Sequence, residues 1–200
     1  MAHIRDEKSD PAFHEDRNLY RILYYDCPPI KKTVFHPLRR QGINFGQSDT
    51  YSWAIDFYSE LKKKRKVALR MGTISDANAH FALTPEATKD LCLGKRRVED
   101  LKDSDFKISF GQKGVDMRIG LDIASLAYKR LVDQIILIAG DSDFVPAAKL
   151  ARREGIDFIL DPMEATIRPD LFEHIDGLKS CWKKKQVKTS GDKDRDLVTV

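Results

Sequence analysis

The feature that most constrains the fold is a run of apolar residues, Ile135–Ala139, which ends at Gly140 and is followed by Asp141 and Asp143. A helix-like pattern begins shortly afterwards, at Pro146. A short apolar run that stops at a turn signal is typical of a strand buried on both faces of a parallel sheet. In open α/β sheets, ligands bind outside the carboxyl ends of such strands. The two carboxylates therefore stand where a divalent cation or an acid–base pair is expected.

Strand and helix patterns alternate along most of the chain. We expect strands over residues 19–25, 67–71, 107–110, 135–139 and 158–160, and helices over 50–64, 117–132 and 146–153. Residues 37–48 are expected to form an irregular basic connection, and residues 72–105 an excursion made of a hairpin with short helices. Gly155 is placed to end the last helix in the left-handed conformation. This alternation predicts an α/β fold with a mainly parallel sheet.

The size and composition suit one domain with tails. We expect residues 1–18 to be poorly ordered, residues 19–182 to form the domain, and residues 183–200 to be a flexible charged tail. No apolar run reaches the roughly 18 residues of a membrane span, and the polar, acidic N-terminus is unlike a signal peptide. The three cysteines are far apart and form no C-x-x-C pair, which favours a reducing compartment, the cytoplasm.

A third acid is expected to join Asp141 and Asp143. Asp116 follows Gly114 at the start of the helix that leads into the strand at 135–139, so it should lie near the carboxyl end of that strand. Mg²⁺ prefers carboxylate oxygens, and Gly140 and Ser142 would let the chain curl so that both neighbouring acids face one ion. The alternative is that Gly-Asp-Ser-Asp is a turn in which Ser142 or Asp143 caps a helix.

Four further residues are candidates for a supporting role. Asp122 lies six residues beyond Asp116, is rotated away from it on a straight helix, and suits a salt bridge better. Asp26 ends the first predicted strand and could flank the pocket, although Asp before Cys-Pro-Pro is also common turn chemistry. Lys113 and Arg118 bracket Asp116 and are candidates for phosphate contacts.

Several of these segments resemble a known family. The blocks are Gln112-Lys-Gly-Val-Asp116, Leu121-Asp-Ile123, Gly140-Asp-Ser-Asp-Phe144, Leu23-Tyr-Tyr-Asp26 with Pro28-Pro29, and Ala151-Arg-Arg-Glu-Gly155. They are similar to the signature blocks of the NYN domain, and most similar to its LabA-like branch within the PIN-like nuclease superfamily. The resemblance extends from Leu19 to Trp182.

The resemblance implies a three-layer PIN-like, Rossmann-like sandwich with a mainly parallel central sheet. It also implies a ribonuclease that holds Mg²⁺ or Mn²⁺ and hydrolyses RNA phosphodiesters, with single-stranded RNA as the partner we expect. Carried over by motif, the metal-binding and catalytic acids are Asp116, Asp141 and Asp143. Asp122, Asp26 and Ser142 then support the site. Homo-oligomerisation is left open.

The chain departs from the family pattern at its start. The family begins with a strand ending in Ile-Asp-Gly-x-Asn or similar, and nothing before Leu19 matches it. We therefore expect that strand to be missing or altered and catalysis to be impaired. One alternative is a non-catalytic RNA-binding or protein-interaction module on the same fold. Another is a phosphatase of the haloacid dehalogenase type, because Asp141–Val145 fits its Asp-x-Asp-x-Val motif.

Overall fold

The computed structural model describes residues 18–139, 142–163 and 165–179. They fall in two compact units, one within His14–Val132 and one within Asp133–Val200, and each is described here by itself. Disorder was expected for residues 1–18 and 183–200, and all of these except residue 18 lie outside the described residues. No helix in the described part of the chain is long and apolar enough to cross a bilayer.

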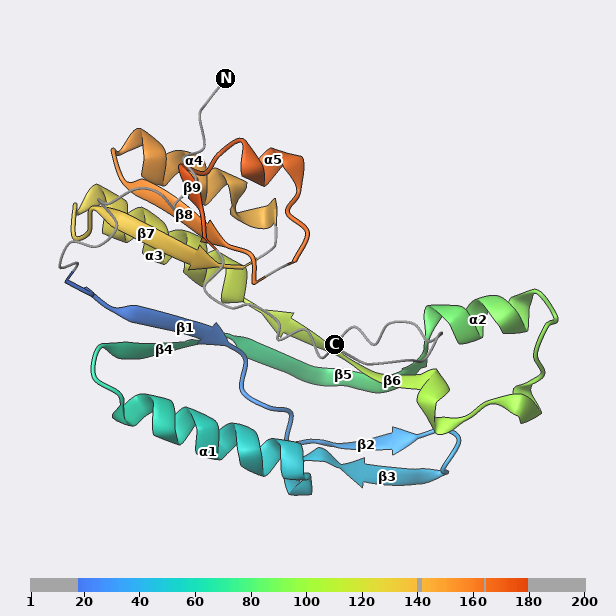
Figure 1. The fold of residues 1–200 in the computed structure, drawn as a ribbon. Coiled ribbons are helices and arrows are strands. Elements are labelled where there is room, and N and C mark those ends of the chain that lie inside the picture. The colour runs from blue at the N-terminus through green and yellow to red at the C-terminus, as the bar shows by residue number, and fades with distance from the viewer. Residues whose placement is uncertain (1–17, 140–141, 164, 180–200) are drawn as a thin grey trace, which may run out of the picture. The chain divides into compact units, whose positions relative to one another are not determined.

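The first unit contains a three-layer α/β/α arrangement (Figure 1). Strand β1 (Ile22–Asp26) pairs in parallel with β4 (Val67–Met71), with Asp26 opposite Met71. Successive side chains of β1 point to opposite faces of this sheet. The ring of Tyr24 packs edge-on against Phe57 of helix α1 (Asp49–Lys63), at 5.7 Å between centroids. On the other face, Tyr25 contacts helix α3 (Val115–Tyr128).

Local sequence explains where helix α1 begins and ends. The side chain of Ser48 accepts a hydrogen bond from the backbone N–H of Tyr51 at 3.1 Å, which caps the first turn. Asp49 lies in that first turn, and Lys62 and Lys63 lie in the last. Each charge has the sign that the helix dipole favours at its end. The helix predicted over residues 50–64 is therefore confirmed.

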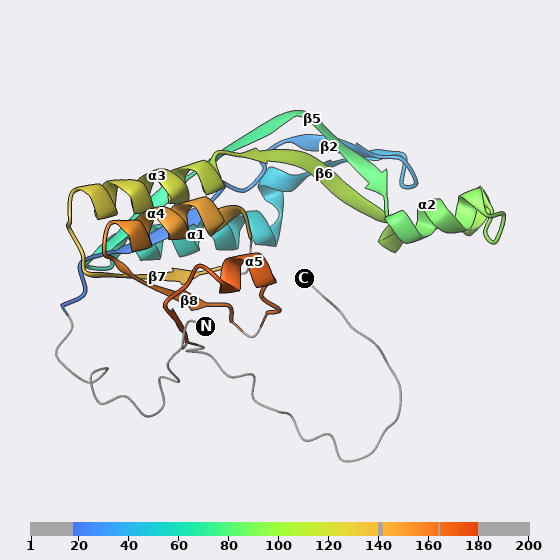
Figure 2. The ribbon, with the colours of Figure 1, turned by 90° about the horizontal axis from the view of Figure 1, so that it is seen from above.

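A long arm follows β4. Strand β5 (Thr73–Leu83) and strand β6 (Phe106–Lys113) form an antiparallel hairpin, and α2 (Pro85–Cys92), η3 (Val98–Asp100) and η4 (Asp103–Asp105) lie between them in the chain (Figure 2). A salt bridge of 2.6 Å between Arg96 and Asp105 closes this excursion. The predicted hairpin with short helices is confirmed. The helix predicted over residues 117–132 is present but begins at Val115 and ends at Tyr128.

Residues 37–48 are not an irregular connection. Strand β2 (Thr33–His36) and strand β3 (Gln41–Asn44) form a second antiparallel hairpin, followed by the 3₁₀ turn η2 (Phe45–Gln47). Its inner face is buried, and the ring of His36 packs against Phe81 at 4.4 Å and Phe106 at 5.2 Å. Packing against distant residues thus overrides the weak strand preference of Gly and Asn.

The second unit is a βαβ arrangement with an added strand. Strand β7 (Gln134–Ile138) pairs in parallel with β8 (Asp157–Asp161), and β8 pairs in parallel with β9 (Gly177–Leu178). Between β7 and β8 come the 3₁₀ turn η5 (Ser142–Phe144) and helix α4 (Val145–Arg153), and α5 (Pro169–Phe172) precedes β9. Gly155 has φ +82°, as expected for the residue that ends α4. The core is built on Phe158, Leu160 and Leu171, all fully buried.

These elements confirm a mixed α/β fold with parallel strand pairs and flanking helices. In the part of the chain that the structure describes, the parallel sets are β1–β4 and β7–β8–β9. The antiparallel sets are the hairpins β2–β3 and β5–β6. Strands β1, β4, β6, β7 and β8 overlap the five segments that were predicted as strands, whereas β2, β3 and β9 lie where no strand was predicted.

Candidate functional site

Gly72 marks the point where three segments of the first unit meet. Its backbone N–H donates to the carbonyl of Asp26 at 2.7 Å, at the end of β1. A β-carbon on Gly72 would stand 2.8 Å from the carbonyl oxygen of Lys113, 2.8 Å from Val115 Cγ2 and 2.9 Å from Cys27 Sγ. The carboxyl ends of β1 and β4 therefore lie directly against the junction between β6 and α3.

Asp116 lies just beyond this junction, in the first turn of α3. Gly114 precedes the helix with φ +83°, a left-handed conformation that lets the chain turn sharply out of β6. The side chain of Asp116 is exposed. Among the described residues, no side chain forms a hydrogen bond or ion pair with its carboxylate. Both oxygens of Asp116 are thus open to a ligand, at a helix terminus that favours an acid.

Asp26 is placed at the end of β1, as the sequence predicted, but its oxygens are engaged. Oδ1 accepts from the backbone N–H of Cys27 at 2.7 Å. Oδ2 accepts from the hydroxyl of Tyr58 at 2.9 Å and from that of Tyr24 at 3.3 Å. Burial and the neighbouring carboxylate raise the pKa of both phenols. Asp26 therefore joins helix α1 to the end of the sheet.

Asp122 joins helix α3 to the opposite face of the same sheet. Its carboxylate accepts from both Nε and Nη2 of Arg70 in β4, the former at 2.7 Å, and from the hydroxyl of Tyr25 at 2.8 Å. The side chain of Asp122 is 13 % exposed and that of Arg70 is 46 % exposed. The Arg70 guanidinium holds the pKa of Asp122 below its ordinary value. The salt bridge expected from its position on the helix is present.

Two cations bracket Asp116 along the chain. Lys113 is the exposed last residue of β6. Arg118 is also exposed, and its Nε lies 3.9 Å from the point where a β-carbon of Gly114 would stand. Arg118 is also among the charges that lower the pKa of Asp122. The start of α3 therefore presents one open carboxylate among positive charges.

The remaining predicted site residues belong to the second unit. Asp141 lies outside the described residues, Ser142 begins η5, and Asp143 is exposed within it. The N-cap of α4 is Phe144, so Asp143 does not cap that helix. No group of three or more His, Cys, Asp or Glu side chains that could hold a metal is found within the described residues. The shared site of Asp116, Asp141 and Asp143 therefore stays a prediction.

Sequence reasoning did not single out Tyr24, Tyr25, Tyr58 or Arg70 as neighbours of the acids. A partial signal existed for two of them. Tyr24 and Tyr25 are adjacent in a strand, so they must face opposite helices. Arg70 gave no such signal, because its pairing with Tyr25 in the sheet register depends on how β1 and β4 align.

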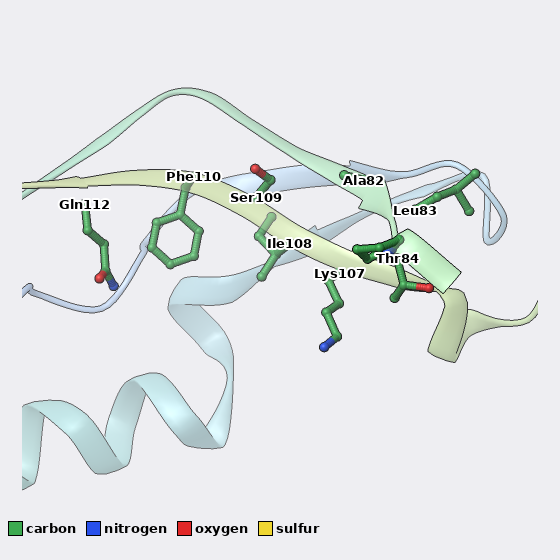
Figure 3. Close-up of a pocket in the computed structure, with 9 residues that line it drawn as sticks. Ala82, Leu83, Thr84, Lys107, Ile108, Ser109, Phe110 and Gln112 are labelled. Carbon is green, nitrogen blue, oxygen red and sulfur yellow. The ribbon is translucent and has the colours of Figure 1, made fainter. Parts of the chain in front are cut away.

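A shallow hollow of about 380 Å³ lies along the arm formed by β5 and β6 (Figure 3). Ile108, Phe110 and Gln112 of β6 line it, together with Lys107 and the end of β5. No carboxylate is among its lining residues. This hollow therefore lacks the carboxylates of a magnesium or manganese site, and the start of α3 is the better candidate.

Comparison with known proteins identifies the family. A family model, the NYN domain, matches residues 56–168. This segment includes the β6–α3 junction, the acids of α3 and the segment from β7 to β8. Neither a curated protein nor a solved structure matches the chain. Because the family model covers more than half of the sequence, the chain belongs to the NYN domain family.

Proposed function

We propose that this chain is a metal-dependent ribonuclease that hydrolyses phosphodiester bonds in single-stranded RNA. The NYN domain has a PIN-like nuclease fold, and the mixed α/β layers agree with it. The observation that carries the proposal is Asp116, an exposed acid without a described partner that lies between Lys113 and Arg118 at the start of α3. The LabA-like branch and a cytoplasmic location are part of the same proposal, supported by the sequence blocks and the cysteine spacing.

The donor set suits a hard divalent cation. Mg²⁺ and Mn²⁺ take carboxylate oxygens and keep positions for water and phosphate. Asp116 offers such oxygens, whereas those of Asp26 and Asp122 already accept hydrogen bonds from protein groups. On the sequence blocks we assign Asp141 and Asp143 as further ligands. When bound, the ion would lower the pKa of water and stabilise charge on the leaving oxygen.

The other residues bind and position. Lys113 and Arg118 would attract the RNA phosphates that flank the scissile bond, and the N-terminus of α3 adds partial positive charge. Asp122 holds α3 against the sheet through Arg70 and Tyr25, so it fixes the direction in which Asp116 points. Asp122 and Asp26 therefore act as positioning residues.

A cleavage assay on end-labelled single-stranded RNA tests the proposal. Wild type should cleave with added Mn²⁺ or Mg²⁺ and stop when EDTA is added. Asp116→Asn and Asp141→Asn should each lower the rate by about 100-fold or more, because the lost ligand destabilises the transition state by several kcal/mol. The matched control is Asp56→Asn, an exposed acid of α1, which should cleave like wild type.

Two results would overturn the assignment. Cleavage that survives both EDTA and Asp116→Asn would exclude a metal-dependent site at this acid. RNA binding with no cleavage at any Mg²⁺ or Mn²⁺ concentration would instead assign the chain to the non-catalytic RNA-binding alternative.

A further inference from the structure

The outer face of the β2–β3 hairpin carries an exposed aromatic ring. Phe35 is 61 % exposed, whereas its neighbours Val34 and His36 are buried on the inner face. The inner face is held by the packing of His36 against Phe81. No aromatic ring in the described part of the chain stacks on Phe35. The hairpin is thus anchored on one side and presents an exposed ring on the other.

The residue opposite Phe35 in the partner strand is a glycine, which has no side chain. Gly42 stands directly opposite Phe35 in the strand register, and Asn44 stands opposite Thr33. A β-carbon on Gly42 would lie 2.8 Å from the methyl carbon of Thr33, so a side chain there would require Thr33 to shift. Phe35 therefore has no cross-strand side chain over it, and one side of its ring is open to a flat ligand.

The same segment is uniformly basic. Residues 28–48 contain Lys31, Lys32, Arg39 and Arg40 and no acid. Arg39 forms a salt bridge with Asp103 at 2.6 Å, and the ammonium of Lys32 donates to two backbone carbonyls of β5. Lys31 and Arg40 have no acidic partner among the described residues. Both are exposed, so their charge is available to an anionic ligand.

The two cations flank the ring. Thr33 and Phe35 alternate in β2 and so share its outer face, and Lys31 lies in the segment that leads into this strand. The Cγ of Lys31 lies 2.9 Å from the position of a β-carbon on Gly46, so the stem of Lys31 lies against the turn η2 that follows β3. Arg40 lies in the turn that connects β2 to β3, beyond Phe35. One exposed cation therefore precedes the exposed ring along the chain, and another follows it.

We propose that this face binds single-stranded RNA, with one base stacked on Phe35 and adjacent phosphates bound by Lys31 and Arg40. Stacking on an exposed aromatic side chain tolerates any base, because every base has a π-face, and nearby cations follow the phosphate backbone. Bases of a duplex are already stacked, so an unpaired strand is the form that fits. This proposal rests on the proposed function, in which RNA is the ligand, and adds the surface that binds the RNA strand.

Trp53 supplies a matched control. It is 63 % exposed, nearly the same as Phe35. Its ring is already stacked on Phe57, with centroids 5.1 Å apart and an interplanar angle of 6°. Its helix also carries Asp49 and Asp56, which repel phosphate. Trp53 is therefore exposed but is not expected to bind RNA.

Fluorescence anisotropy with a short labelled single-stranded RNA, in EDTA so that no cleavage occurs, tests the proposal on the full chain. Phe35→Ala should weaken binding by about 5- to 150-fold, the range for loss of one stacked base. Phe35→Trp should bind at least as tightly as wild type, and Trp53→Ala should be unchanged. In the double variant Lys31→Gln/Arg40→Gln, the negative slope of log affinity against log salt concentration should become shallower by about 1.4, because two phosphate contacts are lost.

The proposal is overturned if Phe35→Ala binds the single strand like wild type. It is also overturned if Phe35→Ala and Trp53→Ala weaken binding equally, or if Phe35→Ala weakens the binding of a duplex RNA as much as that of the single strand. Cleavage measured separately keeps the two proposals apart. If Phe35→Ala loses affinity but wild type does not cleave RNA, this surface is supported and the nuclease is refuted. If wild type cleaves RNA but Phe35→Ala keeps its affinity, only this surface is refuted.

Discussion

Replacing Asp122 by alanine should destabilise the fold, whereas replacing Asp116 should not. Asp122→Ala removes the acceptor for the half-buried hydroxyl of Tyr25, at 2.8 Å, which costs about 1 kcal/mol. It also removes the ion pair with Arg70. Because Arg70 is 46 % exposed and can return to water, that pair adds no more than about 1 kcal/mol. The expected loss in free energy of unfolding is about 2 kcal/mol.

Urea unfolding followed by far-ultraviolet circular dichroism measures this loss. A change of about 2 kcal/mol lowers the midpoint by about 1 M urea when the slope is about 2 kcal/mol per molar. Asp116→Ala, at an exposed position on the same helix, should change the free energy of unfolding by less than about 0.5 kcal/mol. Both variants remove one carboxylate, so their net charge is the same and their comparison isolates the contacts of Asp122.

The pH dependence gives the same prediction an independent check. The pKa of Asp122 is lowered in the folded state, chiefly by Arg70. The ionised carboxylate therefore stabilises the fold above the ordinary Asp pKa of about 3.9. This stabilisation is lost as the pH falls through the lower pKa of the folded state. Wild type and Asp122→Ala should therefore converge in stability in acid. Equal stability of the two proteins at neutral pH would show that these bonds do not hold α3.

Two further predictions concern the sheet ends. Tyr58→Phe should make the free energy of unfolding less sensitive to alkali, because burial and Asp26 raise the pKa of Tyr58. The protonated hydroxyl stabilises the fold below the ordinary Tyr pKa of about 10. This stabilisation is lost as the pH rises through the higher pKa of the folded state. Unfolding scans across alkaline pH measure this, and parallel curves for variant and wild type would contradict it. Gly72→Ala should cost about 2 kcal/mol in thermal unfolding, because its β-carbon would stand 2.8 Å from a backbone carbonyl. Gly111→Ala, with its nearest contact at 3.5 Å, is the matched control and should be nearly neutral; equal costs would refute the clash.

The parts of the fold that sequence could predict are those whose pattern is local. Val67–Met71 forms a strand with the predicted bounds, because it is a short, mostly apolar run that is bounded by basic residues on one side and by Gly72 on the other. The β2–β3 hairpin could not be predicted in this way. Its strands have four residues each, and β3 contains Gly42 and Asn44, which disfavour strands. It is stabilised by burial of His36 against Phe81, which lies far along the chain.

The acids show the same limit at the level of chemistry. Sequence spacing places Asp26, Asp116 and Asp122 at strand ends or on one helix, but it says little about which oxygens are already occupied. The donors that occupy them are distant, since Tyr58 lies 32 residues from Asp26 and Arg70 lies 52 residues from Asp122. Asp116 lies in the first turn of α3, is exposed, and forms no side-chain hydrogen bond or ion pair with the described residues. Replacing an acid that ligates the metal should lower metal affinity with little loss of stability, whereas replacing an acid that holds the helix should lower stability as well. Asp116 and Asp122, on the same helix, therefore form the pair that can distinguish a nuclease site from a charged helix surface.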